Sequence, residues 1–157
     1  MTNIGARFAV LSLITGLTVL TIAQAQEKKI KREELPPAVE KTVSEQSQGA
    51  TIKGFSTEVE KGKRLYEIEL SVNGHGKDIS MDKDGKIVEV EEEVAMDSLP
   101  PEVKTGLTRA AGSGTITRVE SLTKGGKLVA YEAGVKNGPK HSEVQVGPNG
   151  KKLAHEE

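Results

Sequence analysis

A duplicated motif is the strongest constraint on how this chain folds. The motif Leu-Pro-Pro-x-Val begins at Leu35 and again at Leu99, 64 positions later in a chain of 157 residues. One residue is inserted in the second copy, and at an offset of 65 Tyr66-Glu67 then matches Tyr131-Glu132. Because the match runs over about 60 residues with a single insertion, the sequence indicates two tandem copies of one structural unit.

Each copy begins with the pattern of an amphipathic helix. Proline suits the first turn of a helix, where its missing N–H leaves no hydrogen bond unmade. Apolar residues then recur every fourth position, which places them on one helix face. Gly49 and Gly112 are suited to end the two helices. The apolar positions are Leu35, Val39 and Val43 in the first copy and Leu99, Val103 and Leu107 in the second.

Strand patterns follow each helix. Residues 65–72, Leu-Tyr-Glu-Ile-Glu-Leu-Ser-Val, alternate apolar and polar side chains, which is typical of a half-buried strand. Asn73-Gly74 indicates a tight hairpin turn. Residues 51–59 and 115–123 indicate the first strand of each unit, with a bulge or a late strand start because their apolar spacing breaks period two. Residues 86–92 form the last strand of the first unit, with Val88 and Val90 predicted to face inward.

The sequence therefore predicts an α+β fold with two tandem helix-plus-four-strand antiparallel repeats. A unit of this size buries little surface alone, which favours two units joined in one sheet. The helices would cover one face of the shared sheet and leave the other to solvent. We assign the repeats to residues 34–93 and 94–157, with residues 26–33 as a charged flexible lead.

The first 25 residues have the pattern of a secretory signal peptide. Arg7 is their only charged residue, an apolar run follows, and Ala23-Gln24-Ala25 is a small-x-small cleavage site. A buried helix and a membrane anchor are the alternatives, but the run is shorter than the roughly 20 residues that a membrane-spanning helix needs. We expect cleavage after Ala25 and a periplasmic or secreted protein without a membrane span in the mature chain.

Composition excludes several kinds of chemistry. The chain has no cysteine, so disulfides, thiolate metal sites and cysteine nucleophiles are absent. Loss of residues 1–25 takes the net charge from −1 to −2, which is no footprint of nucleic-acid binding. No motif of a catalytic, zinc-binding or phosphate-binding site is present, so we expect no enzyme activity and no cofactor. Asp82 to Lys86, Asp-Lys-Asp-Gly-Lys, indicates a turn rather than a calcium loop, which needs more acidic ligands.

Charge is distributed unevenly between the two repeats. Residues 34–93 hold 14 acidic and 8 basic residues, a net charge of −6, whereas residues 98–157 hold 6 and 9, a net charge of +3. On the strand pattern, acidic side chains of the first repeat point away from the helices. They could attract a protein partner, serve only solubility, or bind cations. The candidate partner surface consists of Glu67, Glu69, Asp78, Glu89 and Glu91.

These motifs resemble a known family. The Leu-Pro-x-x-Val helix, Tyr66-Glu67-Ile68 and Asp82-Lys-Asp-Gly-Lys-Ile are similar to the PepSY-like domains of bacterial envelope proteins. The tandem arrangement resembles the group likened to beta-lactamase inhibitor proteins. The second copy departs from the pattern, because Gly147-Pro-Asn-Gly lacks both aspartates. The resemblance implies a periplasmic or secreted module that binds or inhibits another protein, such as a peptidase; the alternative is a cation-binding or cation-responsive envelope protein.

Overall fold

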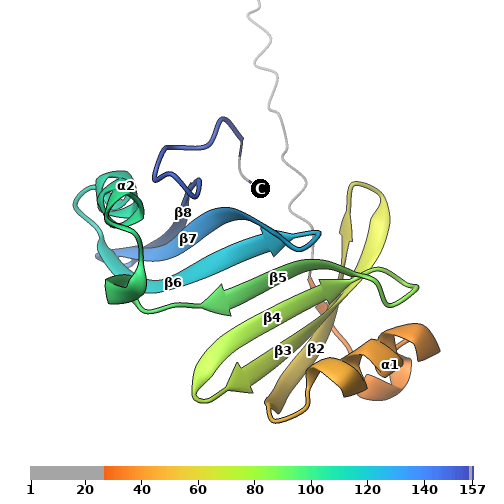
Figure 1. Ribbon diagram of the computed structural model, residues 1–157. Helices are drawn as coiled ribbons and strands as arrows, with labels where there is room; N and C mark the ends of the chain where they lie inside the picture. Colours follow the sequence, from red (N-terminus) through yellow and green to blue (C-terminus); the bar gives the residue numbers. More distant parts are fainter. Residues whose placement is uncertain (1–26, 156) are drawn as a thin grey trace, which may run out of the picture.

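The computed structural model describes residues 27–155 and residue 157. The signal peptide predicted over residues 1–25 lies outside the described residues. Figure 1 shows α1 and α2 beside a strongly twisted sheet. The elements in chain order are β1 (Lys28–Lys29), η1 (Arg32–Glu34), α1 (Pro37–Gln46), β2 (Thr51–Glu60), β3 (Lys63–Val72), β4 (His75–Met81), β5 (Ile87–Glu93), η2 (Met96–Ser98), α2 (Pro101–Ala111), β6 (Thr115–Lys124), β7 (Lys127–Asn137) and β8 (Lys140–Val146).

The eight strands form one antiparallel sheet in which each strand pairs with the next along the chain. The two repeats join where β5 pairs with β6, with Glu91 opposite Leu122. The predicted α+β fold, with one sheet shared by two tandem units, is therefore confirmed. The second repeat is shorter than the first, because its fourth strand is reduced to an isolated bridge between Val146 and Lys152.

The helices begin where the double prolines predict. Pro37 and Pro101 occupy the first helical positions of α1 and α2. Val39 and Val103 come two residues later and are 0% exposed. In Figure 1, α1 lies beside the strands of the first repeat and α2 beside those of the second. Within the described residues, neither helix is long and apolar enough to cross a membrane.

Two apolar clusters, rather than one continuous core, lie between the helices and the sheet. Both clusters are on the same face of the sheet. Val90 packs against the first cluster and is opposite Thr123 of β6. Every second side chain of a strand lies on the same face, so Thr123 shares its face with Ser121 and with the buried Val119 of the second cluster. The first cluster contains Leu35, Val39, Val43, Ile68, Leu70, Ile79 and Met81. The second contains Leu99, Val103, Leu107, Val119, Ala133 and Val146.

A glycine turn anchors each helix to the sheet at the same place in the repeat. Gly85 has φ +77 and packs so closely on the carbonyl group of Ala38 that an added Cβ would collide with it. Thr42 Oγ1 donates a hydrogen bond to the Gly85 carbonyl oxygen, 2.8 Å away. Gly150, with φ +70, packs on the carbonyl group of Glu102, the position that matches Ala38. The helices are thus held by backbone contact as well as by apolar packing.

Bulges occur near the start of the first long strand of each repeat, which is one of the two interpretations that the irregular apolar spacing allowed. One lies between Ile52 and Gly54 of β2, and the other between Ile116 and Arg118 of β6. A bulge puts two residues opposite one on the neighbouring strand and increases the local twist. The strong twist of the sheet in Figure 1 is consistent with this effect.

A further bulge corrects the prediction for β5. The pairing shifts so that Met81 is opposite Ile87 and Ser80 is opposite Glu89. Val88 is the extra residue of the bulge and has no partner on β4 in this register. Ile87 and Val90 pack against the first cluster, whereas Val88 borders a surface hollow with Glu89. The prediction that Val88 points inward was therefore wrong, because strict alternation does not hold across a bulge.

The charged stretch 26–33 also differs from its prediction as a flexible lead. Lys28 and Lys29 form β1, which pairs with Thr57 and Ser56 at the edge of the sheet. The N–H of Ile30 donates to the carbonyl oxygen of Phe55 over 3.0 Å. This stretch has high charge and no strand periodicity, but backbone hydrogen bonds at a sheet edge do not depend on side-chain pattern.

Candidate functional site

All five predicted surface residues lie on the face of the sheet opposite the helices, hereafter the open face. The register aligns Glu69 of β3 with Asp78 of β4 and Asp78 with Glu91 of β5. These three carboxylates thus form a row across three strands. Glu67 and Glu89 form a parallel row, each opposite the same serine of β4. The alternation in the sequence thus predicted the correct face, and all five residues are half-buried.

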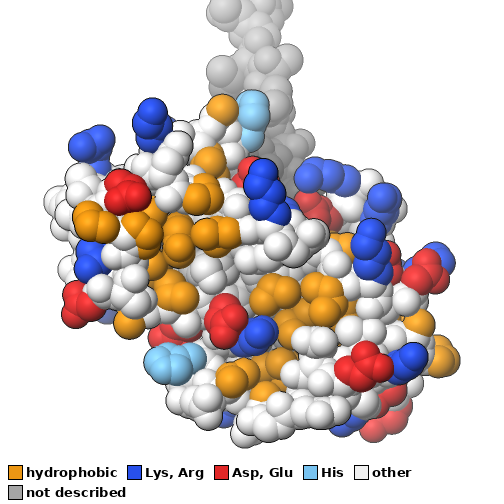
Figure 2. Space-filling view, viewed as in Figure 1, with side chains coloured by type: hydrophobic (Ala, Val, Ile, Leu, Met, Phe, Trp, Pro, Cys, Tyr) orange, Lys and Arg blue, Asp and Glu red, His pale blue; other side chains and the backbone are white. Residues whose placement is uncertain are grey.

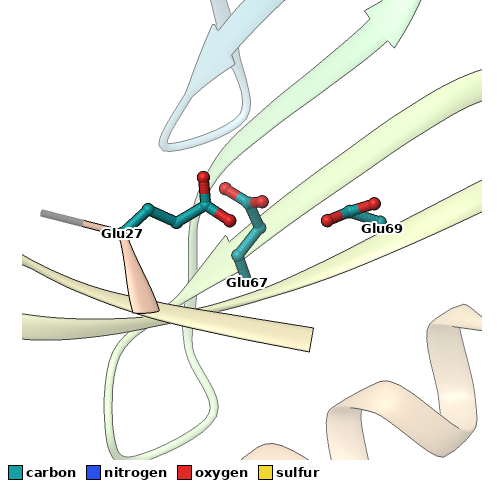
Figure 3. A group of neighbouring side chains, drawn as sticks. All are labelled: Glu27, Glu67 and Glu69. Atoms are coloured by element: carbon teal, nitrogen blue, oxygen red, sulfur yellow. The ribbon is translucent and has the colours of Figure 1, made fainter. Parts of the chain in front are cut away.

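The structure adds a residue that sequence reasoning missed. Glu27, just before β1, points toward Glu67 and Glu69 of β3 (Figure 3). One carboxylate oxygen from each of the three residues lies within 4.8 Å of the others. Glu27 belongs to the stretch expected to be flexible, and no local pattern relates it to a strand far along the chain.

A second carboxylate group spans the junction between the repeats. Asp78, Glu91 and Glu120 come from β4, β5 and β6, and their carboxylate oxygens also lie within 4.8 Å of one another. Glu120 is only 3% exposed, and its Oε2 lies 2.9 Å from Nη2 of Arg118. The sequence could have indicated Glu120 only through the register of β5 on β6, which brings the two repeats together.

Burial and mutual repulsion weaken the acidity of the open face. Burial raises the pKa of Glu67 to about 7, and the negative charge of Asp78 adds to the increase. Burial raises the pKa of Glu91 to about 8, with the largest charge contribution from Glu132. Burial likewise raises the pKa of Asp78. Near neutral pH Glu67 and Glu91 are therefore partly protonated, and a nearby cation would displace their protons.

Two basic side chains compensate part of this charge. Nζ of Lys124 lies 3.1 Å from Oε2 of Glu89, and Arg118 pairs with Glu120. Glu89 is thus the predicted site residue whose charge is already paired, whereas the row from Glu69 to Glu91 crosses the middle of the first repeat. The open face can therefore attract basic groups or cations, most strongly along this row.

The other side of the molecule has a different distribution of charge. In the view of Figure 2, acidic side chains lie singly or beside basic ones, around patches of hydrophobic side chains. All three histidines, His75, His141 and His155, are exposed. The grouped carboxylates of the open face are therefore the most distinctive chemical feature of the described residues.

Comparison with known proteins gives structural likeness but no sequence match. Neither the protein-family models nor the curated proteins match this sequence. A DUF2874 family protein from Bacteroides ovatus superposes with a TM-score of 0.58 at 18% identity, covering 76% of this chain and 84% of the other. A BLIP-like protein from Bacteroides fragilis gives a TM-score of 0.55 at 21% identity, covering 76% and 83%.

A candidate periplasmic protein from Bacteroides eggerthii gives a TM-score of 0.61 at 15% identity, covering 76% of this chain and 86% of the other. At such identities the likeness concerns the fold alone. The chain therefore has a BLIP-like α+β fold, and the resemblance to PepSY-like domains stays a prediction.

Proposed function

We propose that this protein is a non-enzymatic periplasmic or secreted module that binds a protein partner through its open face. The observation that carries this proposal is the row of Glu69, Asp78 and Glu91 across three strands. The location rests on the signal-peptide pattern and on the likeness to a candidate periplasmic protein. The PepSY-like motifs and the BLIP-like fold support partner binding, and inhibition of a bound hydrolase is one form that this function would take.

The partner should present lysine and arginine side chains. The raised pKa of Glu67 and of Glu91 shows that their surroundings disfavour the charged form of the carboxyl group. A positive charge from a partner would stabilise that charged form. Such complementarity accelerates encounter more than it adds affinity, and salt weakens the acceleration. A basic partner should therefore associate fast at low ionic strength.

Site-specific crosslinking tests which face makes contact. A photo-crosslinking amino acid in place of Glu69 on the open face should capture a protein in an envelope extract of the source organism. The same substitution at the exposed Glu45 of α1 is the control. Capture of the same protein at position 45 and not at position 69 would place the contact on the helices.

Charge reversal then tests the chemistry with the captured partner. The variant carries Glu67→Lys, Glu69→Lys and Glu89→Lys, and association rate is measured against ionic strength. We expect association at low salt to slow by at least about tenfold, with the difference shrinking as salt rises. A control with the same net charge reverses three exposed glutamates elsewhere, Glu33, Glu45 and Glu102. Equal rates for the two variants would contradict binding at the open face.

Cation binding is a second candidate function. The two carboxylate groups each bring three carboxylates together, and calcium takes about six to eight oxygen ligands. Calorimetry with calcium at two pH values would test it, because a cation that displaces protons from Glu67 and Glu91 binds more tightly as pH rises from 6 to 9. Binding heat that survives Asp78→Asn combined with Glu67→Gln would exclude these groups as the site.

A further inference from the structure

The second repeat places opposite charges on either side of a glycine on the open face. The register aligns Arg118 of β6 with Gly134 of β7 and Gly134 with Glu143 of β8. Neighbouring strands lie about 4.8 Å apart, so the backbones that carry the two charges are about 10 Å apart. Because the middle residue has no side chain, the space between the two charged side chains is left open.

The matching row of the first repeat is filled, and the only charges in it are negative. Its members are Gly54, Glu69 and Asp78, in the positions of Arg118, Gly134 and Glu143. Oε1 of Glu69 lies 3.3 Å from the point where a Cβ of Gly54 would be, so this side chain covers the glycine. The duplicated backbone thus provides two equivalent places, and only the second one is hollow with charges of both signs.

The hollow has the size of a small-molecule site. Its volume is about 450 Å³, and Thr117, Arg118, His141 and Glu143 line it around Gly134. Pockets for small ligands typically span roughly 300–1,000 Å³. Arg118 is half exposed, and its ion pair with Glu120 is made through Nη2 of a guanidinium that has five N–H donors. The hydroxyl group of Thr117 donates a hydrogen bond to the carbonyl oxygen of Gly134, 3.1 Å away, and this bond fixes its position beside the glycine at the base of the hollow.

We propose that this hollow binds a free α-amino acid in its zwitterionic form. The carboxylate of the ligand pairs with Arg118, and its ammonium group pairs with Glu143 on the opposite side. His141, two residues from Glu143 on β8, borders the ammonium side, and Thr117 of β6 lies beside Arg118. This binding site is separate from capture of a protein partner and does not depend on it.

Charge balance favours a zwitterion over a singly charged ligand. A lone carboxylate at Arg118 would lie close to the carboxylates of Glu120 and Glu143, whose charges are near enough to influence one another. A lone ammonium at Glu143 would face the guanidinium of Arg118 across the hollow. Only a ligand that carries both charges pairs with each wall and repels neither, and this is how electrostatic complementarity produces specificity.

Titration monitored by two-dimensional NMR tests the proposal on the purified protein. The probes are leucine, N-acetyl-leucine and leucinamide, which have the same side chain. Leucine carries both charges, N-acetyl-leucine only the negative charge and leucinamide only the positive charge. Leucine should shift the backbone amide signals of Gly134 and Glu143 in a saturable manner. The two singly charged probes should bind at least about tenfold more weakly, since a hydrogen bond to a charged group is lost in each case.

Three variants and one matched control assign the contacts. Arg118→Gln and Glu143→Gln should each weaken leucine binding at least about tenfold. Gly134→Val should abolish it by filling the floor, although a Cβ there would lie only 3.2 Å from Oγ1 of Thr117 and the variant needs a check of folding. Glu69→Gln, at the matching position of the first repeat, should leave leucine binding unchanged.

Several results would overturn the proposal. Leucine that causes no saturable shift up to its solubility limit would show that the hollow is not a ligand site. N-acetyl-leucine that binds as tightly as leucine would show a site for anions alone. Unchanged leucine affinity in Arg118→Gln or in Glu143→Gln, with the spectrum of the rest of the protein preserved, would show that the charged walls do not hold the ligand.

Discussion

Glu91→Gln should stabilise the protein in a way that depends on pH. Glu91 lies on the open face beside other carboxylates, and burial followed by the charge of Glu132 raises its pKa from 4.5 to about 8. A carboxyl group whose pKa is higher in the folded state holds its proton there more tightly than in the unfolded chain. The free energy of unfolding therefore falls as pH rises from about 4.5 to about 8.

The magnitude follows from the size of the shift. From 4.5 to about 8 is 3.5 pKa units, and at about 1.36 kcal/mol per unit this gives an upper limit of about 5 kcal/mol. Glu91 is only half-buried, and solvent screening reduces the interactions of partly exposed charges severely, so we expect about 1–2 kcal/mol. Glutamine has nearly the same shape and no charge, and it removes this penalty. Glu91→Gln should thus be close to neutral at pH 5 and more stable than the wild type at pH 9.

Urea denaturation followed by circular dichroism at pH 5, 7 and 9 measures the effect. Glu45→Gln, on the exposed side of α1, is the control and should change the free energy of unfolding little at any of these pH values. A gain that is the same at pH 5 and pH 9 would refute the reasoning, because it would show better packing rather than relief of charge. A loss at pH 9 would show that Glu91 is held by an attractive partner.

Two predictions concern stability away from the open face. Gly85→Ala should cost about 2–5 kcal/mol, because the left-handed conformation costs about 1–2 kcal/mol and overpacking against α1 adds about 1–3. Gly49→Ala is matched in φ, at +76 against +77, but has open space around it, so denaturation should show only the conformational cost; equal costs would contradict the docking contact. Val39→Ala and Val103→Ala should each cost about 2 kcal/mol, and because the residues lie in separate clusters the double variant should match the sum within about 0.5 kcal/mol. A clear departure from additivity would mean that the two clusters are energetically coupled through the shared sheet.

The part of the fold that follows local rules could be predicted from the sequence. The double prolines and the four-residue apolar spacing indicated both helices, and the buried Val39 and Val103 confirm the faces. The alternation of apolar and polar residues around Tyr66 indicated which side chains lie on the face of the sheet opposite the helices. Repetition strengthened both predictions, because each pattern occurred twice at matching positions.

The rest depended on contacts between distant segments. The approach of Glu27 to β3 and of Glu120 to β4 follows from strand pairing that neither local sequence records. The bulge at β5 exchanged Ile87 for Val88 in the core, because a one-residue slip reverses which face a side chain occupies. Backbone pairing at the edge of the sheet likewise placed Lys28 and Lys29 in a strand despite their charge.

The two repeats differ most where packing does not decide the residue. Core positions keep apolar residues of similar kind, such as Ile79 and its match Val144, because a helix has to cover them in both copies. On the open face the matching positions Glu69 and Gly134 differ in size and charge, although the same backbone carries them. A surface required only for solubility would accept any polar residue at these positions, whereas a glycine between Arg118 and Glu143 removes polar surface and leaves a hollow. The differences between the copies are therefore what the two proposals predict, a partner surface on the first repeat and a ligand site on the second.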